Sequence, residues 1–150
     1  MTADIKISDT ELFQMIDKKL SETIDKEILE GLENYLNIVR KKSKALASSL
    51  NRCFENARKS MRYVLAYKLG EEEKNNDVEE NNIEKYLEDH LKDYFEKNDF
   101  MPYREFVRLL RACTIEVGGD VSSEIKKRYN DFFFGERLVE AYKMGILTNR

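Results

Sequence analysis

The sequence predicts a mainly α-helical protein, with a helical bundle-like domain over residues 1–100 and a small C-terminal module over residues 101–150 that we interpret as β. An all-α fold is the alternative. Apolar residues recur at spacings of three and four through most of the first hundred residues. The only proline, Pro102, marks a boundary, because the residue before a proline is disfavoured in helical geometry. Beyond it, CTIEV at 113–117 alternates apolar and polar residues, as a half-buried strand does.

The first two helices have clear signals. Ser8 and Glu11 have the spacing of a capping box, which predicts a helix that starts there. It carries Leu12, Phe13, Ile16 and Leu20 inward. A second helix follows directly, because a set of apolar residues recurs on one helical face: Ile24, Ile28, Leu32, Tyr35, Leu36 and Val39.

A long third helix and a fourth complete the predicted bundle over residues 8–98. The third has an apolar stripe from Leu46 to Leu69 and ends at Gly70, a residue type that often stops helices. Residues 71–82, EEEKNNDVEENN, have no apolar periodicity and predict an exposed loop. The fourth helix presents Ile83, Tyr86, Leu87, Leu91, Tyr94 and Phe95.

The C-terminal module is ambiguous in sequence. REFVRLLRAC fits a helix with Phe106, Leu109, Leu110 and Cys113 inward, whereas CTIEV alternates. GGD at 118–120 predicts a turn, and a second turn is expected at Gly135, after the run of three phenylalanines. We favour β structure here and keep a helical ending as the rival.

Composition restricts the class of protein. The chain has 150 residues, 37% of them charged, with a net charge of −3, so bulk charge by itself indicates no particular ligand. Cys53 and Cys113 lie far apart and His90 is the only histidine, which leaves little for a zinc site or a disulfide framework. No apolar run approaches the ~18 residues of a membrane span, and we expect a cytoplasmic protein without membrane contact.

No constellation points to catalysis. His90 is flanked by Glu88, Asp89 and Asp93, a setting typical of a surface histidine on an amphipathic helix. The Asp89 and Asp93 pair has a spacing common in any acidic chain, and phosphate-binding loops and zinc motifs are absent from the sequence. We therefore predict a non-enzymatic protein with no catalytic residue, metal or cofactor.

Charge is distributed unevenly along the chain. Residues 40–68 carry nine Lys/Arg against one acid, and residues 71–99 carry twelve acids against four lysines. The two segments neutralise each other within the bundle, or the basic one meets DNA or an acidic neighbouring subunit. For the second case the candidate interface residues are Arg52, Arg58, Lys59, Arg62, Tyr63 and Tyr67.

Several short motifs resemble those of GINS subunits, a family of replication-fork proteins. Arg58, Arg62, Leu65 and Ala66 are similar to the central signature of the family's helical domain, and the acidic stretch followed by IEKYLEDHLKDYF resembles the part that comes next. In the C-terminal part, VRLL at 107–110, GGD at 118–120, FFFGE at 132–136 and MGIL at 144–147 follow the order of the family's small β module.

The resemblance implies an archaeal GINS subunit with the helical domain first. Such a subunit would act as a non-catalytic scaffold of DNA replication, in a hetero-oligomeric tetramer bound to the MCM helicase and a RecJ-family partner, with Arg58 and Arg62 buried between subunits. Two alternatives remain open. One is a DNA- or RNA-binding accessory protein, such as a primase accessory subunit, and the other is a helical small subunit of an RNA-guided defence complex.

Overall fold

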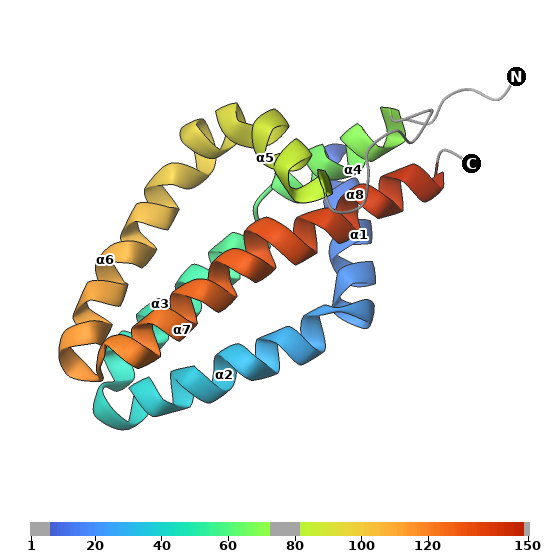
Figure 1. Cartoon of the computed structure of the whole chain (residues 1–150). Helices are drawn as coiled ribbons and strands as arrows, with labels where there is room; N and C mark the ends of the chain where they lie inside the picture. The colour runs from blue at the N-terminus through green and yellow to red at the C-terminus, as the bar shows by residue number, and fades with distance from the viewer. Residues whose placement is uncertain (1–6, 73–81, 149–150) are drawn as a thin grey trace, which may run out of the picture.

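The computed structural model describes residues 7–72 and 82–148, and these residues form helices joined by short turns. In chain order the elements are α1 (Asp9–Thr23), α2 (Asp25–Lys42), α3 (Lys44–Arg58), α4 (Arg62–Glu72), α5 (Ile83–Tyr94), the π-helical turn η2 (Phe95–Asp99), α6 (Phe100–Glu116), α7 (Gly119–Asp131), the π-helical turn η3 (Phe132–Glu136) and α8 (Arg137–Thr148). The segment α7, η3 and α8 runs as one long helix through the molecule (Figure 1).

The predicted β module is wrong, and the all-α alternative is correct for the described residues, which contain no strand. The alternation in CTIEV is only five residues long, and its first four residues continue α6, which ends at Glu116: Cys113 is buried, whereas Ile115 is 84% exposed. So short an alternation is ambiguous, since one buried and one exposed apolar residue two positions apart also suit a helix. The chain does not change direction at FFFGE, because Gly135 lies inside the π-helical segment η3, which continues α7 into α8.

Four helices pack around the first of two apolar clusters. Around the ring α2, α3, α6 and α7, each helix contacts the next, and neighbours run antiparallel (Figure 1). Aromatic rings fill the centre: Phe106 and Tyr129 stack with centroids 3.8 Å apart, and Phe54 and Phe133 pack beside them. Burying each such ring stabilises the fold by about 1.5–3 kcal/mol.

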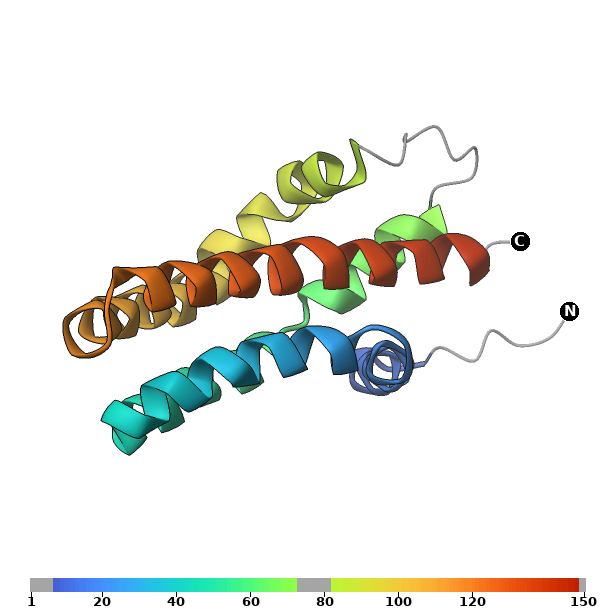
Figure 2. The same ribbon diagram turned by 60° about the horizontal axis from the view of Figure 1, so that its bottom comes forward.

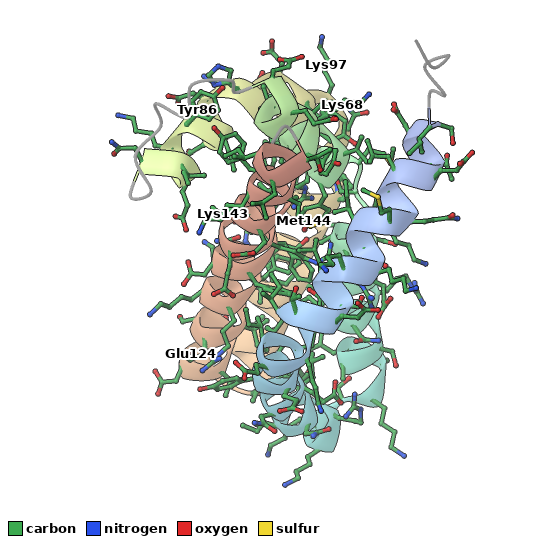
Figure 3. The ribbon with its side chains drawn as sticks, turned by 90° about the vertical axis from the view of Figure 1, so that its right-hand side faces the viewer. Lys68, Tyr86, Lys97, Glu124, Lys143 and Met144 are labelled. Atoms are coloured by element: carbon green, nitrogen blue, oxygen red, sulfur yellow. The ribbon has the colours of Figure 1, made fainter. Side chains whose placement is uncertain are left out.

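The second cluster gathers α1, α4, α5 and α8 at the other end of the molecule. In Figure 2 the long α7–α8 helix lies between α5 on one side and α1 with α2 on the other. Figure 3 places Lys68 and Met144 at this end and Glu124 of α7 at the opposite one. The two clusters follow one another along the long helix, so a single element links both.

Helices α4 and α8 make backbone contact at two glycines. A Cβ on Gly70 would lie 2.1 Å from the Tyr142 carbonyl oxygen, and one on Gly145 would lie 2.0 Å from that of Tyr67. A side chain at either position would force the helices apart. Gly70 therefore serves close packing inside α4, which corrects its predicted role as a helix terminator.

The long third helix predicted from Leu46 to Leu69 is interrupted. Residues 59–61 leave helical geometry, and Ser60 donates to the Asp99 carboxylate instead of continuing the helix. The apolar spacing continues past the break, although α3 buries its apolar residues in one cluster and α4 buries its own in another, so periodicity alone conceals the break.

Pro102 does not end a helix but lies within the first turn of α6. A proline has no N–H to donate to the carbonyl four residues earlier. The widened π turn η2 ends at Asp99, directly before α6. The predicted division at residue 100 falls at the start of α6, and residues on both sides of it share the two clusters.

The helix predicted from Ser8 is confirmed: the Glu11 backbone N–H donates to Ser8 Oγ at 3.1 Å, and α1 follows. The helices predicted to follow, over α2 and α5, are confirmed as well. Of the loop predicted for 71–82, residues 73–81 lie outside the described residues, whereas Glu71 and Glu72 belong to α4. The turn predicted for 118–120 lies one residue earlier, at Val117 and Gly118, and Gly119 already begins α7. Gly118 has a φ of 129°. Among the described residues, no helix combines the length and apolar character that crossing a membrane requires.

Candidate interaction surface and the buried arginines

The six residues predicted as an interface fall into two groups. Arg62, Tyr63 and Tyr67 are buried within this chain, and Arg58 is partly buried at its edge. Arg52 and Lys59 are exposed. An interface on this part of the chain therefore depends on the second group.

Arg62 is only 4% exposed and is neutralised inside the chain. Its Nε donates to Asp99 Oδ2 at 3.0 Å and to Ser60 Oγ at 3.1 Å. Its guanidinium lies 4.0 Å from the Phe134 ring centroid, a cation–π distance. Asp99 belongs to η2 and Phe134 to η3. Arg62 therefore connects α4 to two segments that are distant in the sequence.

A second buried cluster surrounds Arg137, whose side chain is fully buried at the start of α8. Arg137 donates to both carboxylate oxygens of Asp25, at 3.0 and 3.1 Å, to Asp17, and to the Arg58 carbonyl. Burial is the largest single influence and would lower the pKa of Arg137, but the hydrogen bonds to Asp25 and Asp17 and the nearby charges of Asp25 and Tyr63 together outweigh it, and the pKa is raised. Arg137 therefore stays charged in the interior, where its partners offset the cost of desolvation.

Arg58 completes this cluster from the end of α3. Its Nε donates to Asp17 at 3.1 Å, and Nη2 donates to Ser21 at 2.6 Å. Asp25 lies 3.7 Å from the same Nε, so the acids that neutralise Arg58 come from α1 and α2. Neutralisation by the acidic 71–99 segment, one of the two sequence interpretations, holds for Arg62 with Asp99 but not for Arg58.

The tyrosines also serve contacts between helices. The Tyr63 hydroxyl donates to the Phe133 carbonyl at 3.1 Å, and burial raises the pKa of Tyr63. That carbonyl belongs to the π turn η3 and also accepts from Arg62 Nη1 at 3.4 Å. Tyr67 pairs with Thr148 at 2.7 Å between their oxygens. Neither ring remains available to a partner surface.

Sequence reasoning missed Asp25, Asp99 and Arg137. The available signal was a charged residue at a core position of an apolar stripe: Asp25 precedes buried Leu32 by seven residues, and Arg137 precedes buried Ala141 by four. Such spacing indicates burial, but it does not tell which partner shares the site.

The exposed arginines lie along the contact between α3 and α6. Arg52 of α3 and Arg108 of α6 both act electrostatically on the Cys53 thiol at this contact, so they lie on either side of it. Arg104 and Arg111 lie one turn before and after Arg108, and both are exposed. We call Arg52, Lys59, Arg104, Arg108 and Arg111 the basic face.

The basic face carries few compensating charges. Glu105 pairs with Arg108, which lowers the pKa of Glu105. Arg52, Lys59, Arg104 and Arg111 form no ion pair with any other described residue. The surface therefore keeps an excess of positive charge, although the chain as a whole is acidic.

His90 and the buried cysteines have side-chain types that occur in nucleophilic catalysis and metal binding. The exposed His90 ring lies 2.9 Å from the Tyr86 carbonyl through Nδ1 and packs on the Tyr86 ring. The residues that the structure describes contain no group of three or more metal-ligating side chains. Burial raises the pKa of Cys53 to about 11, which keeps the thiol protonated at neutral pH.

Comparison of this chain with family models, with curated proteins and with solved structures finds no match. None of these comparisons identifies a GINS subunit, so that resemblance stays a prediction. Its C-terminal half no longer applies, because VRLL, FFFGE and MGIL lie in helices.

Proposed function

We propose that this chain is a non-catalytic subunit that binds the phosphate backbone of a nucleic acid through its basic face. One observation carries the proposal: α6 packs beside α3 and adds Arg104, Arg108 and Arg111 to Arg52 and Lys59. Arginine forms paired hydrogen bonds to phosphate oxygens, and such contacts release counterions from the nucleic acid. This is the accessory-protein function among the hypotheses drawn from sequence.

Backbone binding fits this surface better than base reading. The basic residues extend along two antiparallel helices rather than projecting from one end. Rows of cations track a phosphate backbone, whereas reading of bases needs side chains that reach into a groove. We therefore expect low sequence specificity and a strong dependence on salt.

The decisive measurement is fluorescence anisotropy of a labelled single strand and a labelled duplex. Binding should weaken steeply between about 50 and 200 mM salt. Changing Arg104, Arg108 and Arg111 together to Glu should abolish binding. Each lost phosphate contact should reduce the log–log salt slope for duplex DNA by about 0.9.

A matched control uses Lys126 and Lys127, which are exposed on α7 outside the basic face. The double change to Glu removes two positive charges and should leave most of the affinity intact. Equal loss in both variants would mean that net charge, and not this face, governs binding. Absence of binding by the unaltered chain at about 50 mM salt would refute the proposal.

A specific observation also favours a protein partner on the same helix. Met101 is 65% exposed and Ile115 is 84% exposed, and both lie among the arginines of α6. Methionine and arginine are enriched in protein interfaces. The second candidate function is therefore a subunit of a larger assembly, of which the GINS-like scaffold with its MCM and RecJ-family partners is the version implied by the resemblance.

Light scattering after size exclusion separates the two functions. An assembly subunit that contacts copies of itself through α6 should form an oligomer that Ile115→Glu dissociates. A monomer that binds nucleic acid equally well with and without Ile115→Glu would exclude self-assembly through α6 and favour the first function.

A further inference from the structure

A cavity of about 670 Å³ opens between α5, η2, the start of α6 and the η3–α8 junction. Its volume lies in the range of small-molecule sites, roughly 300–1,000 Å³. Leu87, Leu91 and Leu138 supply apolar walls. The basic face takes no part in this lining.

Aromatic rings form one side of the cavity. Phe95, Tyr103 and Phe134 pack edge to face on one another, with centroid separations of 5.5 to 5.9 Å and interplanar angles of 62° to 87°. The two π turns supply the outer members, Phe95 from η2 and Phe134 from η3. π turns inside α-helices occur frequently at functional sites.

The ring of Phe134 already accepts a cation on one face. The Arg62 guanidinium lies 4.0 Å from its centroid and donates to Asp99, and both Arg62 and Asp99 line the cavity. This internal pair shows the chemistry that the cavity accommodates: a planar cation on an aromatic ring with a carboxylate beside it.

The rim is acidic and unneutralised. Glu84, Glu88, Asp89 and Glu96 line the opening, are exposed, and form no ion pair with a described residue. Among the described residues that line the cavity, the cations are the buried Arg62, which is paired with Asp99, and the exposed Lys92. The excess of carboxylates gives the opening a negative potential.

Three further observations agree with that potential. The Glu84 carboxylate rests against η3, 3.2 Å from where a Cβ on Gly135 would lie. Burial, together with the carboxylates of Glu140, Glu27, Glu84 and Asp131, raises the pKa of Glu136. Inside the cavity lining, the buried Asn130 Oδ1 has no hydrogen-bond donor. The unpaired polar groups are thus mostly acceptors.

We propose that this cavity binds a small organic cation, an ammonium or guanidinium group on an apolar stem. The charged group would lie at the rim between α5 and η3, and the stem would pack against the aromatic rings and the leucines. This inference is independent of nucleic-acid binding, because the two sites share no residue.

The test compares three ligands with the same stem: hexylammonium, hexanol and hexanoate. We expect hexylammonium to shift the NMR signals of the Leu87, Leu91 and Leu138 methyl groups in a saturable manner, and to weaken as salt rises. Hexanol should bind more weakly and hexanoate should not bind. Equal affinity for hexanol and hexylammonium, or shifts that map outside the cavity, would overturn the proposal.

Variants locate the charged group. Glu88→Gln and Glu96→Gln should each lower the affinity for hexylammonium by about fivefold, as expected for the loss of one exposed charge near the ligand. Glu124→Gln makes the same chemical change on α7 at the far end of the molecule (Figure 3) and should leave affinity unchanged. Since these residues are not buried, circular dichroism should show unaltered folding. A Glu124→Gln effect as large as the other two would also contradict the site.

Discussion

The four-helix cluster and the junction between the clusters are both buried, but different forces hold them. The cluster is filled by apolar side chains and stacked rings such as Phe106 on Tyr129. The junction is filled by Arg137, Asp25, Arg62 and Asp99, each less than a tenth exposed. An apolar core tolerates exchanges of similar volume, whereas a buried ion pair requires both partners. The junction is therefore where the chain specifies how its helices meet.

The expected largest effect comes from breaking one buried pair. Arg137→Met should lower the free energy of unfolding by about 3–5 kcal/mol, because the buried Asp25 then keeps only a 3.7 Å contact to Arg58 and a long, 3.4 Å hydrogen bond from Ser21. Phe106→Leu in the four-helix cluster should cost about 1–2 kcal/mol. Chemical denaturation measures both values. A smaller loss at Arg137 than at Phe106 would reverse the comparison.

A double variant sharpens the same comparison. Arg137→Met with Asp25→Leu removes both charges and should be more stable than the sum of the two single losses predicts. The coupling should fall in the range of about 0.5–3 kcal/mol that contacting residues show. Strict additivity would mean that the two charges do not depend on each other.

A change of intermediate size concerns the contact between α4 and α8. Gly145→Ala should cost about 1–3 kcal/mol, because its Cβ would meet the Tyr67 carbonyl at 2.0 Å. Gly119→Ala is the control, since a Cβ there meets nothing within 4 Å. It should be neutral or stabilise the protein by up to about 1 kcal/mol. In thermal unfolding, the midpoint temperature should fall for Gly145→Ala and should stay level or rise for Gly119→Ala.

The smallest expected effect is at Glu136, the last residue of η3, which lies near several other carboxylates. Its pKa is raised in the folded state, so folding favours the protonated carboxyl, and this contribution is lost as pH rises through the folded pKa. At neutral pH, Glu136→Gln should therefore stabilise the protein by about a few tenths of a kcal/mol. The gain should shrink as pH falls through the raised folded-state pKa and should be absent below the ordinary pKa of glutamate. A gain that is constant with pH would exclude this electrostatic origin.

Local sequence predicted the helices whose signals are local. The cap at Ser8 and the apolar face of α2 need only residues within one or two turns, so they could be identified without knowledge of their partners. The β interpretation failed at CTIEV and FFFGE because only local residues were available there as well. Short alternation and an aromatic run are compatible with either structure until the neighbours are known.

The candidate surface could be predicted only in part. Arg52 and Lys59 are exposed as a basic surface requires, but the contributions of Arg104, Arg108 and Arg111 depend on α6 packing beside α3. Likewise, the cavity joins α5 to segments about fifty residues later, which no local pattern connects.

The amino-acid order by itself determined that most of this chain is helical, because helical hydrogen bonds and apolar stripes are local. Only the tertiary structure decided which charges are buried and which are presented to partners. Arg58, Arg62 and Lys59 look alike in sequence, yet Arg62 lies against Asp99 and Lys59 faces solvent. A charge enters the interior only where a partner from a distant segment offsets its loss of hydration, and that partner is chosen by the packing of the helices.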